Sequence, residues 1–136
     1  MAVNNSCVAG IMNPTINKKN VTVGNNGIRI CTLGNDKCIA LRFTAARVTG
    51  DQGCSVTIIA GKHNSANNLF RCVIYGEATN ITFHTDNNSI YAYCSSAYYN
   101  CSFEVLTGDG LDILMIPNFV STPYSTITIG KVYTQS

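Results

Sequence analysis

The chain has no tryptophan, three prolines and two histidines among its 136 residues. Charged residues make up 12% of the sequence, about half the usual share in a soluble domain. The formal net charge is +2 and no basic run exceeds the pair Lys18-Lys19, which argues against nucleic-acid binding through a basic patch. No apolar run is long enough to span a bilayer, so we expect no membrane insertion.

The first residues show no targeting signal. Met1 to Ser6 contain neither a basic segment nor an apolar one, so no signal peptide is recognised. We therefore expect a protein that is made and used in the cytoplasm, or one whose signal has been removed.

Short neutral polar residues replace the missing charges. Hydrophobic residues make up 46% of the chain, and Asn, Thr, Ser and Gly fill the intervals between the apolar stretches. Such residues favour strands and turns, and they lose little side-chain entropy when they are buried against a neighbour. The composition thus indicates a surface suited to contact.

Apolar residues recur at every second position, and no segment has a helical period over three turns. Short strands separated by turn signals predict an all-β fold, a two-layer antiparallel β-sandwich of jelly-roll type with about eight to ten strands. The expected strands span residues 20–24, 27–33, 38–48, 54–60, 69–76, 79–84, 89–95, 101–106, 111–116 and 125–133. We expect one domain over residues 19–136, preceded by residues 1–18 as an N-terminal arm or an edge strand.

Alternation assigns the faces of most strands. In the segment 38–48 the inward set is Ile39, Leu41, Phe43 and Ala45, and in the segment 79–84 His84 points outward with Asn80 and Thr82. The segment 111–116 is apolar on both faces. It is either a central strand covered on both sides or a strand whose outer residues Leu114 and Ile116 meet another subunit.

Seven cysteines leave at least one thiol unpaired within the monomer. Cys31 with Cys38, and Cys94 with Cys101, bracket loops of equal length that we interpret as hairpin loops, so each pair can meet as a disulfide or as paired thiols. The first pair is expected on an outward face and the second on the inward face. Reduced thiols are favoured because no signal peptide is recognised. The spacing does not fit a zinc knuckle.

The sequence offers little for catalysis or metal binding. His84 and Asp86 are a conceivable acid–base pair, but no nucleophile motif or paired carboxylates occur. Asp109 and Asp112 suit a turn better than a calcium site. We expect no catalytic residues, no metal and no cofactor, and a protein that is not an enzyme.

Tyrosines suggest a contact surface. Tyr91 and Tyr93 share the outward face of one expected strand, and Tyr98 and Tyr99 lie at the tip of the next hairpin. A tyrosine ring has a flat apolar face and a polar tip, which suits both sugar stacking and protein contacts. Cross-strand packing is the alternative interpretation.

In this texture of few charges and abundant Asn, Thr, Gly and Tyr, the whole chain resembles small virion β-domains of tailed bacteriophages, of the head-decoration or fibre-tip type. The resemblance carries over no individual residue. It implies a structural protein of the virion, made in the host cytoplasm, that binds copies of itself or other virion proteins. The alternative hypothesis is a module that binds a surface glycan or a receptor through the tyrosines.

Overall fold

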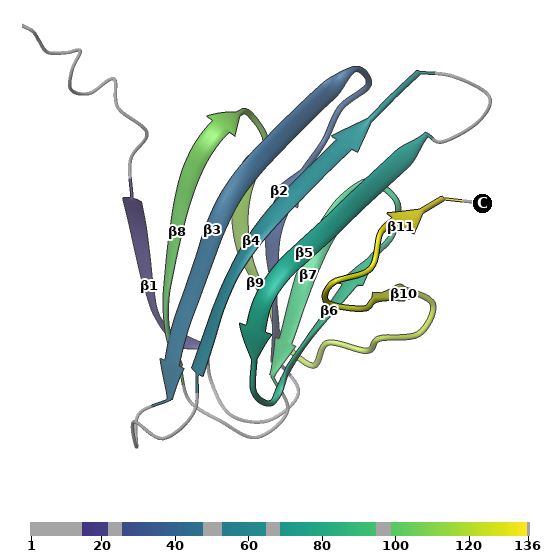
Figure 1. Cartoon of the computed structure of the whole chain (residues 1–136). Helices are drawn as coiled ribbons and strands as arrows, with labels where there is room; N and C mark the ends of the chain where they lie inside the picture. Colours follow the sequence, from purple (N-terminus) through teal and green to yellow (C-terminus); the bar gives the residue numbers. More distant parts are fainter. Residues whose placement is uncertain (1–14, 22–25, 48–52, 65–68, 95–98, 136) are drawn as a thin grey trace, which may run out of the picture.

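A computed structural model describes residues 15–21, 26–47, 53–64, 69–94 and 99–135. The described chain is all-β and forms two antiparallel sheets that pack face to face (Figure 1). Sheet A has the strand order β1-β8-β3-β4-β5-β11, and sheet B has the order β10-β6-β7-β2-β9. The predicted two-layer β-sandwich is therefore confirmed.

The described ranges contain eleven strands. They are β1 (Thr15–Val21), β2 (Asn26–Thr32), β3 (Lys37–Arg47), β4 (Gly53–Lys62), β5 (Phe70–Ala78), β6 (Ile81–Thr85), β7 (Ser89–Cys94), β8 (Tyr99–Gly108), β9 (Leu111–Ile116), β10 (Ser125–Ile127) and β11 (Tyr133–Thr134). Eight of the ten predicted segments match these strands closely, but the first strand spans residues 15–21 and not the expected 20–24. The single strand expected over 125–133 is in fact two strands, one in each sheet.

The order of the strands differs from simple jelly-roll connectivity. β3, β4 and β5 follow one another as a meander in sheet A, and β6 and β7 form a hairpin in sheet B. Successive strands change sheet after β1, β2, β5, β7, β8 and β10. The jelly-roll type is therefore not confirmed.

The core lies between the sheets. The inward set of β3 is confirmed, since Ile39, Leu41, Phe43 and Ala45 are all buried. The rings of Phe43 and Phe103 stack across β3 and β8 with centroids 5.1 Å apart, and the edge of the Phe83 ring in sheet B meets Phe43. Burial of such side chains contributes about 1.5–3 kcal/mol each, which makes this layer the main source of stability.

The N-terminal boundary falls inside a strand. β1 runs from Thr15 to Val21 and pairs with β8 at the edge of sheet A, so residues 15–18 belong to an edge strand. Residues 1–14, on which the arm hypothesis depends, lie outside the described residues. No described helix has the length and hydrophobicity that a bilayer crossing requires.

Candidate functional site

Tyr91 and Tyr93 project from the outer face of β7, and a later part of the same chain covers them. Phe119 lies against Tyr91, Tyr93 and His84 with ring centroids 5.5–5.7 Å apart. Tyr124 stacks on Phe119 at 5.2 Å and 9°, and it also contacts Tyr91. These rings close the outer face of sheet B over β6 and β7.

This cover corrects the expectation of an open tyrosine surface. Tyr91 is only 5% exposed and its hydroxyl donates a hydrogen bond of 2.9 Å to Asp86. Burial, followed by this bond, raises the pKa of the Tyr91 phenol. Tyr93 is half-buried. Tyr98 and the side chain of Tyr99 lie outside the described residues.

His84 is a second correction, because it is buried and does not point into solvent. Its Nε2 atom lies 2.9 Å from the Thr82 hydroxyl, and its Nδ1 atom lies 3.4 Å from the Thr126 hydroxyl. Asp86 is engaged elsewhere, since its carboxylate accepts hydrogen bonds from Tyr91 and from the backbone N–H groups of Asn88 and Ser89. The proposed acid–base pair of His84 and Asp86 is therefore not formed.

Gly27 explains how the aromatic cover fits onto the sheet. It lies in β2 opposite Tyr93 of β7 and Ile116 of β9. A Cβ atom at this position would be 2.8 Å from Cγ of the Phe119 ring. Only glycine leaves room for the ring here, and no sequence pattern links residue 27 to residue 119.

The cysteines are arranged differently from the expected hairpin pairs. Cys31 in β2 and Cys38 in β3 belong to different sheets, with Cys31 buried and Cys38 exposed, so the expectation of a shared outward face is wrong. A bulge between Arg29 and Cys31 shifts the alternation and buries Ile30 and Cys31 together.

Cys94 and Cys101 are both buried, as expected, but they lie in different sheets, Cys94 in β7 and Cys101 in β8, and not in one hairpin. The six cysteines within the described ranges are free thiols. Burial raises the pKa of the thiols in a set of four, Cys31, Cys54, Cys72 and Cys101, to about 12. These thiols therefore pack as small apolar groups.

β9 is an edge strand, so the interpretation of residues 111–116 as a central strand is wrong. Among the described strands β9 pairs only with β2. Leu111 and Ile113 pack against the core, Ile116 is half-buried, and Leu114 is 46% exposed. Within the described residues, β9 therefore has one backbone edge without a strand partner and exposes the apolar side chain of Leu114.

The only acid in β9 is neutralised within the chain. Asp112 accepts a hydrogen bond of 2.7 Å from the Thr32 hydroxyl and forms an ion pair of 2.9 Å with Arg29. The Thr32 bond, followed by the Arg29 guanidinium, lowers the pKa of Asp112 below its usual 3.8. In the described part of the chain no three His, Cys, Asp or Glu side chains gather to hold a metal.

A groove on the outer face of sheet A was not predicted. It has a volume of about 760 Å³ and lies where β3 begins, β4 ends and β5 begins. Its lining includes Lys37, Lys62 and Arg71. No local sequence pattern predicts the groove, because these cations are far apart along the chain.

Comparison of the chain with protein-family models, curated proteins and solved structures gives no match. The geometry of these surfaces is therefore the basis for a functional proposal.

Proposed function

We propose that this protein is a non-enzymatic assembly protein that binds a second copy of itself through the free edge of β9. The observation that carries the proposal is a strand edge that pairs with no other described strand, together with exposed apolar side chains at Leu114 and Met115. An exposed apolar edge of this kind pairs readily with another strand.

The other outer strands are protected in ways that β9 is not. β10 and β11 are only three and two residues long, and the sequence of β1 contains Lys18 and Lys19. Short length and lysine are the usual means by which proteins block edge-to-edge association. β9 has six residues and contains neither lysine nor proline.

Self-pairing of β9 also avoids electrostatic repulsion. Opposite residues in an antiparallel pair lie on the same face of the sheet, so a two-fold pair of identical strands is centred on a residue. A pair centred on Leu114 places Leu114 opposite its own copy and Asp112 opposite Ile116 of the second copy. Because Arg29 already neutralises Asp112, no unpaired like charges meet. Such a contact is two-fold and isologous, the commonest arrangement in homo-oligomers.

The setting that we propose for this assembly is a virion, as a capsid decoration or a fibre component. The sparse charge and the abundance of short polar residues support it, as does the resemblance to phage virion β-domains in composition and strand pattern. The alternative, recognition through the tyrosines, is weakened because Tyr91 is buried under Phe119.

The test is the effect of Leu114→Asp on the mass of the folded protein, measured by light scattering across a concentration series. We expect the native chain to form dimers or larger assemblies. The variant should dissociate at least about a hundredfold more readily, because an interface that buries an unpaired charge loses several kcal/mol.

Leu106→Asp is the matched control. Leu106 is 45% exposed and lies in β8 of sheet A, so this variant should keep the native mass. If Leu114→Asp unfolds by circular dichroism, Leu114→Lys serves in its place. A native chain that stays monomeric at millimolar concentration contradicts the proposal, as does a folded β9 variant that keeps its assembly.

A further inference from the structure

We propose that the groove on the outer face of sheet A binds an acidic sugar, meaning a saccharide that carries a carboxylate or a sulfate. The groove volume of about 760 Å³ lies within the range of about 300–1,000 Å³ that is usual for small-ligand sites. The site goes beyond self-assembly and does not depend on it, because β9 belongs to sheet B and the groove to sheet A.

The hollow results from the side chains that share one row of the sheet. Cys38 of β3, Gly61 of β4 and Arg71 of β5 are neighbours in register. Gly61 has no side chain, and the nearest atom that a Cβ there would meet is Cβ of Cys38 at 3.7 Å. The space above Gly61 is therefore open, with Arg71 on one side.

The floor of the groove is apolar. Ile59 and Val73 are register partners in the next row, and Val132 borders them from the C-terminal segment. Ile59 and Val132 are exposed, so their methyl groups are available to a ligand. One face of a sugar ring is made of C–H groups, and an acetamido group adds a methyl, so this floor suits a saccharide.

The groove has a net positive charge. Three of the nine basic residues, Lys37, Lys62 and Arg71, line it together with one of the seven acids, Asp36. The other six basic and six acidic residues cancel, so the formal net charge of +2 equals the net charge of the groove. An anionic ligand is favoured by this field.

Within the described ranges none of these three cations forms an ion pair. The ion pair in the described part of the chain joins Arg29 to Asp112, away from the groove, and Lys62 donates a hydrogen bond to Asn88. Lys37 and Arg71 are exposed and are left for a ligand. A guanidinium binds a carboxylate or a sulfate through two parallel hydrogen bonds.

Asp36 narrows the choice of anion. One of its carboxylate oxygens accepts a hydrogen bond of 3.1 Å from the backbone N–H of Asn64, and the group has capacity for further donors. Sugar hydroxyls are such donors, whereas a polyphosphate would be repelled. The lining residues in the described ranges include no phenylalanine, tyrosine or tryptophan, and their one ring is the imidazole of His63, so a nucleotide base finds no large aromatic face for stacking.

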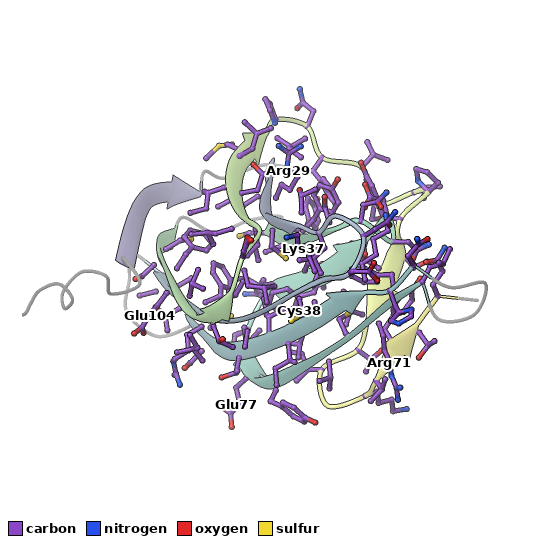
Figure 2. The ribbon with its side chains drawn as sticks, turned by 90° about the horizontal axis from the view of Figure 1, so that it is seen from above. Arg29, Lys37, Cys38, Arg71, Glu77 and Glu104 are labelled. Atoms are coloured by element: carbon purple, nitrogen blue, oxygen red, sulfur yellow. The ribbon has the colours of Figure 1, made fainter. Side chains whose placement is uncertain are left out.

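The charge on this face is graded along the strands. Arg71 lies near one end of β5 and Glu77 near the other, about 20 Å away by strand rise. Figure 2 shows Arg71 apart from both Glu77 and Glu104. An anionic sugar is therefore guided toward the groove and away from the acidic end.

The test uses a panel of oligosaccharides that carry sialic acid, uronic acid or sulfate, with neutral lactose as the control. Binding is measured by calorimetry, and its position is measured by the alkylation rate of Cys38, an exposed thiol in the groove, followed by peptide mass mapping. We expect at least one acidic member to bind, to slow alkylation of Cys38 and to weaken with added salt.

Arg71→Gln should weaken this binding by about tenfold to a hundredfold, as expected for loss of a charge-assisted hydrogen bond. Arg42→Gln is the matched control, since Arg42 is exposed on the same face and lies outside the groove, where it donates to Ser55. The proposal is overturned if no acidic member binds, if lactose binds as well, or if inorganic sulfate protects Cys38 equally. It is also overturned if the two arginine variants behave alike.

Discussion

The outer faces of the two sheets differ in how far other parts of the chain cover them. The face of sheet B over β6 and β7 is closed by Phe119 and Tyr124, which bury Tyr91 and His84. The face of sheet A carries exposed Ile59, Tyr75 and Leu106 and is hollowed by the basic groove. Aromatic residues thus serve folding on one face, while the other face is left open for contact.

The largest test of this contrast is Phe119→Ala. Its ring is buried among four other rings, so we expect a loss of about 3–5 kcal/mol in the free energy of unfolding, measured with urea. Tyr75→Ala on the open face should cost about 0.5 kcal/mol or less, because that ring is half-exposed. Equal losses at the two positions would show that the faces do not differ in this way.

Gly27→Ala should have the next largest effect. The added methyl would lie 2.8 Å from the Phe119 ring, so we expect a loss of about 1–3 kcal/mol from overpacking. Gly61→Ala meets nothing closer than 3.7 Å and should be nearly neutral. In the double variant Gly27→Ala with Phe119→Ala the clash disappears. The loss in the free energy of unfolding of the double variant should therefore be smaller than the sum of the losses in the two single variants. If the two losses are strictly additive, the Phe119 ring does not pack against Gly27.

A smaller effect concerns pH. Burial lowers the pKa of the His84 imidazole below its usual 6.5. Below that pH the unfolded chain therefore binds a proton at His84 more readily than the folded protein does. The contribution of neutral His84 to stability is complete above pH 6.5 and is lost as pH falls below that value. His84→Gln should flatten this part of the stability curve, measured by unfolding at several pH values.

Regular alternation made much of the fold predictable. In β3 every second residue is apolar over four repeats, and a one-residue slip would expose all of them, so the inward face could be read directly. The same logic failed at Cys31, because one bulge in β2 reverses the alternation without any sign in the composition.

The candidate sites were less predictable than the fold. Alternation correctly placed Tyr91 and Tyr93 on an outer face, but it does not tell whether a segment some thirty residues later will cover that face. Leu114 was recognised as a candidate because its strand is apolar on both faces. That β9 is an edge follows only from the pairing of the strands.

Residue type and a spacing of two were enough to predict the all-β layers, the inward sides of the regular strands and the sparse charge. Three features depend on how distant segments pack together: which strand lies at an edge of its sheet, which outer face is covered, and which basic residues lie close together. Lys37, Lys62 and Arg71 share a groove only because β3, β4 and β5 align in register, and such alignment joins residues that no local pattern connects.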